Sequence, residues 1–179
     1  MFKKVRLLKR GKKGSLAFAF GGGGARGALQ VGALKAFLEE GIVPDIIVGT
    51  SAGAANGIFL ALYPDLEHIH LLEKAWLDAS ETDLLPSNMI RVTFYAFLHR
   101  TRMWVNKKLE EFFSAHLPDK DLRFKDIKKI KAYVIAADIN SGRMIVFGDN
   151  LEDKILDALL ASTAIPPWIR PLEKDGQFL

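Results

Sequence analysis

Two glycine-rich segments contain the residues of this chain that are best suited to chemistry. The first to consider, Gly49-Thr50-Ser51-Ala52-Gly53, has the Gly-x-Ser-x-Gly form of a nucleophile elbow. Such an elbow is a sharp turn between a strand and a helix that exposes one serine hydroxyl. Gly49 and Gly53 fit this turn because side chains there would collide with the neighbouring strand or block a substrate. We therefore expect Ser51 to act as a nucleophile; the alternative is that it only caps the following helix.

The other segment, GGGGARG over residues 21–27, stands between an apolar run and a helical pattern. The free backbone N–H groups of such a loop hold anions well. Beside a serine nucleophile they would form an oxyanion hole, in which each donor lowers the barrier by about 2.7–4 kcal/mol. We expect Gly22, Gly23 and Gly24 to supply these donors and Arg26 to orient the loop or bind a lipid phosphate. An ordinary surface arginine is the alternative for Arg26.

The same loop also fits a different class of protein. The spacing Gly22-x-Gly24-x-x-Gly27 matches the dinucleotide-binding fingerprint, which places an acidic residue at the end of the next strand. Here the acid, Asp45, stands at the start of that strand. A P-loop is excluded because no Gly-Lys-Ser/Thr follows the glycines. A serine nucleophile beside an anion-binding loop suggests acyl transfer, so an acyl hydrolase is the first interpretation. A nucleotide-binding module stays open as one alternative, and a non-catalytic membrane-associated scaffold as another.

The elements around these segments form a strand–helix–strand–helix order. Apolar runs predict strands over 15–20 and 45–48, and helical periodicity predicts helices over 28–40 and 52–62, with Gly41 ending the first of them. This order implies a right-handed crossover and parallel strands. Further on, the pattern predicts helices over 65–79, 105–117 and 151–162, and a hairpin of strands over 131–137 and 144–147. The aromatic stretch over 80–104 is interpreted as core, with a lid or an acyl-chain surface as the alternative.

Composition narrows the classes of function. A chain of 179 residues that is 49% hydrophobic fits one domain with a full core. The absence of cysteine excludes disulfides, thiolate metal sites and cysteine nucleophiles, and favours an intracellular location. The four histidines are scattered without metal-ligand spacing, so we expect neither a metal nor another cofactor.

Positive charge is concentrated in a basic N-terminal arm, residues 1–14. Residues 1–13 carry seven lysines and arginines and no acid, whereas the rest of the chain holds more acidic than basic residues. We therefore expect no nucleic-acid partner. The arm could rest on an anionic membrane surface or be a solvated leader. The apolar run after it is too short for a secretory signal, and no window is long enough to span a membrane. We therefore expect a cytoplasmic protein, which is peripheral to membranes only on the first of these two interpretations of the arm.

Together these motifs resemble those of the patatin-like phospholipases. The similarity continues through ADINSGR at 137–143 and ASTAIP at 161–166, and covers the chain from about Leu16 onward. The resemblance implies an α/β fold, a three-layer α/β/α sandwich with a mainly parallel central sheet, over residues 15–179. It implies lipid acyl hydrolysis by a Ser–Asp dyad without histidine or calcium. It also assigns Ser51 as the nucleophile and Gly22, Gly23, Gly24 and Arg26 to the oxyanion loop.

The aspartate of the dyad is where the chain departs from that family. The family supplies it from Asp-Gly-Gly or Asp-Gly-Ala, whereas this chain has Asp175-Gly176-Gln177. In the family a similar Asp-Gly pair commonly forms a hairpin turn just before the catalytic motif. We therefore interpret Asp175 as a turn residue and expect the dyad aspartate just past Leu179. On this interpretation the chain lacks the C-terminal part of the sandwich and hydrolyses poorly by itself.

Overall fold

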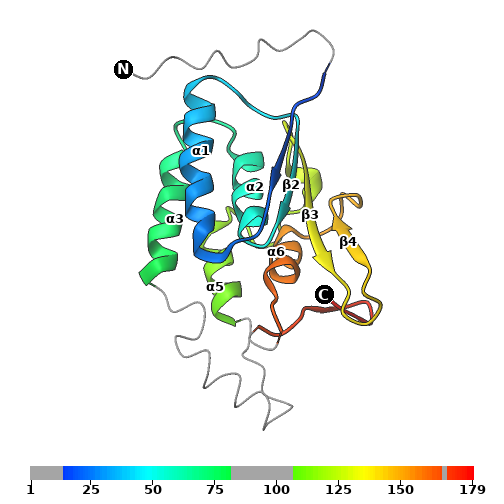
Figure 1. Ribbon diagram of the computed structural model, residues 1–179. Helices are drawn as coiled ribbons and strands as arrows, with labels where there is room; N and C mark the ends of the chain where they lie inside the picture. The colour runs from blue at the N-terminus through cyan, green and yellow to red at the C-terminus, as the bar shows by residue number, and fades with distance from the viewer. Residues whose placement is uncertain (1–13, 82–106, 167–168) are drawn as a thin grey trace.

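The computed structural model describes residues 14–81, 107–166 and 169–179 (Figure 1). The basic arm up to residue 13 and the part of the aromatic stretch from residue 82 onward lie outside these ranges, so both interpretations stay predictions. Within the described ranges, no helix has the length and apolar character needed to cross a membrane.

A four-stranded sheet forms the centre of the fold. Its strands are β1 (Ala17–Phe20), β2 (Ile46–Thr50), β3 (Lys131–Ala137) and β4 (Met144–Phe147), in the spatial order β1-β2-β3-β4. The pairs β1–β2 and β2–β3 are parallel, and β4 returns antiparallel to β3 as a hairpin. A separate two-stranded hairpin joins β5 (Glu173–Lys174) to β6 (Gln177–Phe178). The predicted α/β class with a mainly parallel sheet is therefore confirmed.

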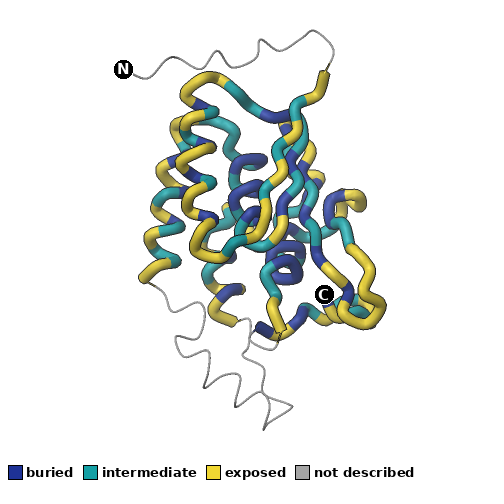
Figure 2. Tube along the Cα trace, in the orientation of Figure 1, coloured by how far each residue is buried: buried dark blue, intermediate teal, exposed yellow. Residues whose placement is uncertain are grey.

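Helices pack against one face of this sheet. The helices are α1 (Ala28–Glu39), α2 (Ala52–Leu62), α3 (Ile69–Glu81), α5 (Lys107–His116) and α6 (Ile155–Thr163), with short 3-10 turns η1 (Gly24–Gly27) and η2 (Phe124–Asp126). In Figure 1, α2 and α6 lie next to the strands, between them and the helices α3 and α5, and Figure 2 shows buried residues concentrated along α2 and α6. The largest fully buried apolar side chains come from these layers: Leu34, Ile47, Ile58, Leu60, Val134 and Ile155.

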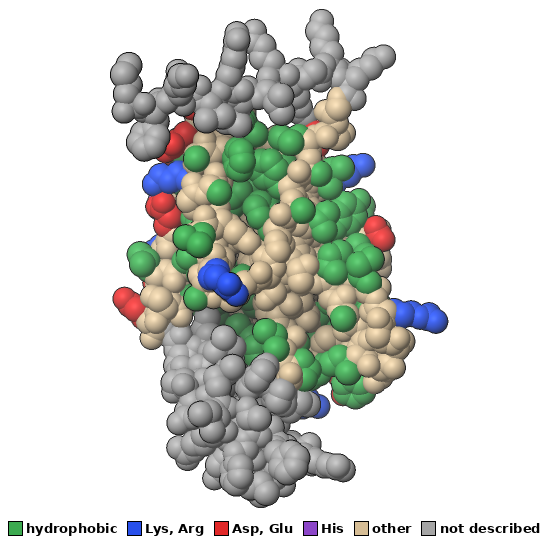
Figure 3. All heavy atoms as spheres, in the orientation of Figure 1, with side chains coloured by type: hydrophobic (Ala, Val, Ile, Leu, Met, Phe, Trp, Pro, Cys, Tyr) green, Lys and Arg blue, Asp and Glu red, His purple; other side chains and the backbone are tan. Residues whose placement is uncertain are grey.

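The opposite face of the sheet carries apolar side chains that no described helix covers. The register aligns Val48 with Tyr133 and Ile135 with Val146, so these side chains share one face, and each is only half-buried. Figure 3 shows hydrophobic side chains exposed over the strands on this side of the molecule. A parallel sheet normally has both faces covered. The described residues therefore account for one of the two helical layers of a sandwich.

Most predicted boundaries agree with the structure, and two helices begin later than predicted. The helix predicted over 65–79 begins at Ile69, because the carboxylate of Asp65 accepts a hydrogen bond from the His68 N–H (3.0 Å) and closes a turn before the helix. The helix predicted over 151–162 begins at Ile155. Its N-terminal residues are diverted because Lys154 forms a β-bridge with Arg123 instead.

Candidate active site

Ser51 occupies a strained turn between β2 and α2. Its backbone has φ 54° and ψ −125°, a conformation that residues with a side chain rarely adopt. Although it stands at the N-cap position of α2, its side chain makes no capping hydrogen bond. The hydroxyl therefore does not cap the N-terminus of α2, and Ser51 is only half-buried. The role of Ser51 as a nucleophile stays a prediction.

Backbone contacts hold Ser51 on both sides. Its N–H donates a hydrogen bond to the hydroxyl of Ser162 (2.8 Å), which comes from the C-terminal turn of α6. Its carbonyl accepts hydrogen bonds from the N–H groups of Ala54 (2.9 Å) and Ala55 (3.2 Å) in the first turn of α2. The strained conformation is thus fixed by neighbours before and after the turn. Ser162 is a contributor that periodicity did not reveal.

Two glycines of the turn are required by close packing of the backbone. A methyl group at Gly53 would overlap the carbonyl of Phe20 at the end of β1. A methyl group at Gly49 would lie 2.6 Å from the Cα of Ala54. The start of α2 therefore lies directly against the ends of β1 and β2, which places Ser51 at the carboxyl edge of the parallel sheet.

The glycine loop lies beside Ser51. A methyl group at Gly22 would lie 3.1 Å from the Cβ of Ser51 and 3.8 Å from its hydroxyl oxygen. After Gly22 and Gly23 the chain enters η1 at Gly24, which has φ +54°. The first N–H groups of a helical turn have no partner within it. Arg26 is exposed in the last turn of η1. The structure thus brings Gly22 and Ser51 together, while the donor roles of the loop and the role of Arg26 stay predictions.

A buried polar network ties this loop to α2 and α3. The Asn56 amide, fully buried in α2, donates to the carbonyl of Gly27 (2.9 Å) and to the side-chain oxygen of Gln30 (2.8 Å). Its own oxygen accepts the indole N–H of Trp76 from α3 (2.8 Å). The Gln30 amide in turn donates to the carbonyl of Gly21 (2.8 Å). Both ends of the glycine segment, Gly21 and Gly27, are therefore anchored to the helices behind them.

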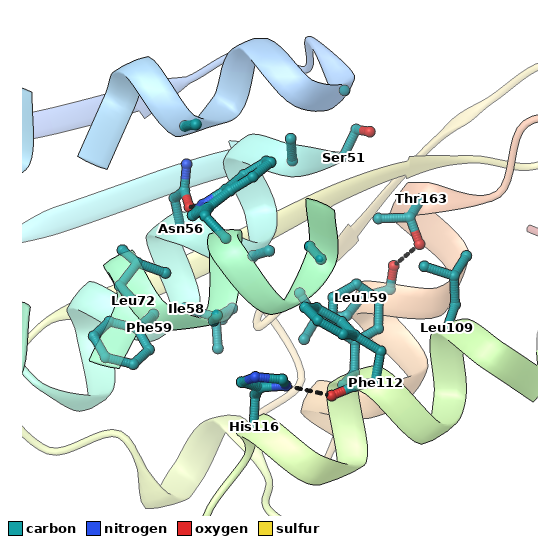
Figure 4. A pocket seen from close by; sticks show the side chains of 18 of the residues that line it. Ser51, Asn56, Ile58, Phe59, Leu72, Leu109, Phe112, His116, Leu159 and Thr163 are labelled. Atoms are coloured by element: carbon teal, nitrogen blue, oxygen red, sulfur yellow. Dashed lines mark hydrogen bonds between the residues drawn. The ribbon is translucent and has the colours of Figure 1, made fainter. Parts of the chain in front are cut away.

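An apolar cavity of about 480 Å³ opens beside Ser51 and Gly24. It extends between α2, α3, α5 and α6, as Figure 4 shows from close by. Its walls are mostly aliphatic and aromatic, with Ile58, Phe59, Leu72, Phe112 and Leu159 among them. His116 lines it as well, and its ring lies 2.8 Å from the carbonyl of Phe112. The volume and lining match a site for one apolar ligand chain.

The carboxylates of Asp138 and Asp175 differ in their surroundings. Asp138, just after β3, is buried, and hydrogen bonds hold the pKa of its carboxyl below the usual range: chiefly one from the Ser141 hydroxyl (2.5 Å), then backbone N–H groups such as that of Asn140. Asp175 is exposed in the turn between β5 and β6, with φ 51°, followed by Gly176 at φ 77°. Its interpretation as a turn residue is confirmed.

Ser51 thus lies in a strained turn at the carboxyl edge of a mainly parallel sheet, with the glycine loop against it, in a protein of the α/β class. The sequence model of the patatin-like phospholipase family matches residues 18–179. The chain therefore belongs to the patatin-like phospholipase family.

This chain spans only part of the length of the relatives that it matches. Patatin-like phospholipase domain-containing protein 7 from Rattus norvegicus is 31% identical over 166 residues, which is 92% of this chain and 12% of that protein. Lysophospholipase nte1 from Aspergillus terreus is 51% identical over 61 residues, 34% of this chain and 4% of that protein. YqhO from Bacillus subtilis is 28% identical over 167 residues, 86% of this chain and 57% of that protein.

A solved structure is similar in fold. The type III effector protein ExoU superposes with a TM-score of 0.51 at 19% sequence identity, covering 86% of this chain and 41% of ExoU. At this level of identity the similarity concerns the fold alone. It agrees with the arrangement of sheet and helices described above.

Proposed function

We propose that this chain carries the nucleophile of a lipid acyl hydrolase, and that Ser51 forms an acyl-enzyme with the acyl group of a phospholipid or related ester. One observation carries the proposal: the Ser51 hydroxyl makes no capping bond, lies beside Gly22, and stands at an apolar cavity of about 480 Å³. The names of relatives, which include phospholipases and a lysophospholipase, support the same class of substrate.

In the proposed reaction the Ser51 oxygen attacks the ester carbonyl. A carboxylate base accepts its proton as the new C–O bond forms and the carbonyl oxygen becomes an oxyanion. N–H groups of the loop at Gly22–Gly24 stabilise that oxyanion. The bond to the alcohol then breaks, the alcohol leaves with a proton, and water hydrolyses the acyl-enzyme to free acid. Asp175 is not proposed as the base, because it occupies an exposed hairpin turn.

The cavity would hold the acyl chain of the substrate. Its walls at Ile58, Phe59, Leu72 and Phe112 offer apolar contacts and few hydrogen-bonding groups. A nucleotide would need several polar partners around its base and ribose. The apolar lining beside the glycine loop therefore favours a lipid over the dinucleotide that the loop spacing also fits.

Labelling with a fluorophosphonate probe tests this proposal. The full-length protein should become labelled on Ser51, and Ser51→Ala should abolish the label. Ser114→Ala, on α5 and away from the cavity lining, is the matched control and should label like the wild type. A folded protein that is not labelled, or that is stabilised against heat by NAD or ATP, would contradict the proposal. Binding to lipid vesicles without any Ser51-dependent activity would favour the scaffold instead.

A further inference from the structure

Ser162 links the turn at Ser51 to β3, one of the two inner strands of the sheet. It is 8% exposed, and its hydroxyl makes two short hydrogen bonds: it accepts the N–H of Ser51 (2.8 Å) and donates to the carbonyl of Ile135 in β3 (2.6 Å). A hydroxyl is one of the few side-chain groups that donates and accepts through a single atom. The two partners belong to segments far apart in the sequence, so the bond pair connects β3, α6 and the turn.

The position of these bonds follows from the way the β2–β3 pairing ends. The last paired residues of the two parallel strands are Thr50 and Ile135. At Ser51 the chain leaves the sheet for α2, so its N–H turns away from the ladder. The Ser162 hydroxyl lies between that N–H and the Ile135 carbonyl, and satisfies both groups where the direct ladder stops. Without it, both polar groups would be left unpaired in a mostly buried place.

We propose that Ser162 is a positioning residue, which fixes the backbone of Ser51 and thereby the direction of its hydroxyl. The inference rests on the proposed function of Ser51. A backbone at φ 54° and ψ −125° costs energy and persists only where neighbours determine it. The first turn of α2 holds the carbonyl side of Ser51, and Ser162 holds its N–H side. Loss of the Ser162 hydroxyl releases one of the two anchors.

Two variants separate positioning from general stability. Ser162→Ala removes both hydrogen bonds, and Ser162→Thr keeps a hydroxyl at the same atom. Ile155→Val is the matched control, because Ile155 is fully buried at the other end of α6 and lies outside the cavity lining. Its shortened side chain weakens the packing of the same helix and leaves the Ser162 bonds in place.

The first readout does not depend on activity. Hydrogen exchange at the Ser51 amide, measured on the full-length protein, should accelerate at least tenfold in Ser162→Ala and stay near the wild-type rate in Ser162→Thr and Ile155→Val. An unchanged exchange rate in Ser162→Ala would overturn the positioning role whatever the activity.

The second readout is catalytic. With a short-chain soluble ester, kcat for Ser162→Ala should fall at least tenfold, while KM changes less than twofold. Ser162→Thr should recover most of the lost kcat, and Ile155→Val should have the wild-type kcat. Faster exchange with wild-type kcat would also overturn the inference. A wild-type protein that neither turns over the ester nor reacts with a fluorophosphonate would instead refute the proposed function, a result distinct from either outcome at Ser162.

Discussion

Replacing Asn56 by leucine is the sharpest test of how the glycine loop is held. Leucine has the same branching and the same number of side-chain heavy atoms as asparagine and suits a helix interior better, although its two methyl groups make it larger. The extra volume in the core adds to the cost of losing the hydrogen bonds. What the substitution removes is the set of hydrogen bonds to Gly27, Gln30 and Trp76. Asn56 is fully buried, so water cannot replace its side chain there.

The size of the effect follows from the partners left behind. A buried polar group without a partner costs about 1–3 kcal/mol. The Gly27 carbonyl and the indole N–H of Trp76 would each lose their bond to Asn56, whereas half-buried Gln30 can turn toward water. The loss of these two bonds lowers the free energy of unfolding by about 2–6 kcal/mol. For a chain of 179 residues this corresponds to a fall in Tm of roughly 4–24 °C.

Urea denaturation followed by circular dichroism measures this loss. Trp76→Phe removes one of the same bonds and should cost about 1–2 kcal/mol, and the double variant should cost less than the sum of the two single ones, since both lose a shared bond. Asn140→Leu, the same substitution at an exposed turn position, should stay within about 0.5 kcal/mol of the wild type. If Asn56→Leu costs no more than Asn140→Leu, the network does not anchor the loop.

Three further predictions concern the turn, the cavity and acid stability. Gly53→Ala should destabilise the protein by about 3 kcal/mol, because its methyl group meets the Phe20 carbonyl. Gly32→Ala is the control: Gly32 lies on an exposed face of α1 with open space around it, so this change should stabilise the protein by about 0.5–1 kcal/mol. Urea denaturation measures both. In a series of ester substrates of increasing acyl length, kcat/KM should rise about fourfold for each added CH₂ until the cavity is full, because burial of one CH₂ contributes about 0.8 kcal/mol. A kcat/KM that does not change with acyl length would contradict the assignment of the cavity to the acyl chain. Since the Ser141 hydroxyl bond lowers the pKa of Asp138, the stability it contributes is complete above the unfolded value of about 3.9 and is lost as the pH falls through the lower folded value. Ser141→Ala should therefore be less stable than the wild type at pH 7, with a difference that narrows in acid; a difference independent of pH would refute this cause.

Hydrophobic periodicity and turn residues predict the bounds of strands and helices where these depend on residues close in the sequence. The strands at Lys131–Ala137 and Met144–Phe147 and the helix Ala52–Leu62 have the predicted bounds, because hydrophobic runs and turn residues mark each of them. The start of α6 was wrong because Lys154 pairs with Arg123, about thirty positions earlier in the chain. Such a pairing leaves no trace in the periodicity of the segment itself.

The candidate site was predictable to a similar extent. The spacing indicates the close packing at Gly49 and Gly53, since the steric demand of the turn falls on residues near Ser51 in the sequence. The hydrogen bond from Ser51 to Ser162 cannot be predicted in this way, because it joins residues 111 positions apart. Asn56 carried a signal that was not used: a polar side chain in the middle of an otherwise apolar helix needs a partner.

Helix α6 contacts the turn at Ser51 and also forms part of the cavity wall, so a bound acyl chain could affect the turn. Ser162 holds the Ser51 N–H, and the next residue, Thr163, lines the cavity from the same turn of α6. An acyl chain packed against that turn would favour the arrangement of α6 that also holds the backbone of Ser51, the proposed nucleophile. Binding energy from the remote part of a substrate would then be expressed partly in the reaction step. We therefore expect longer acyl chains to raise kcat as well as lower KM, and an effect confined to KM would show that cavity and turn act independently.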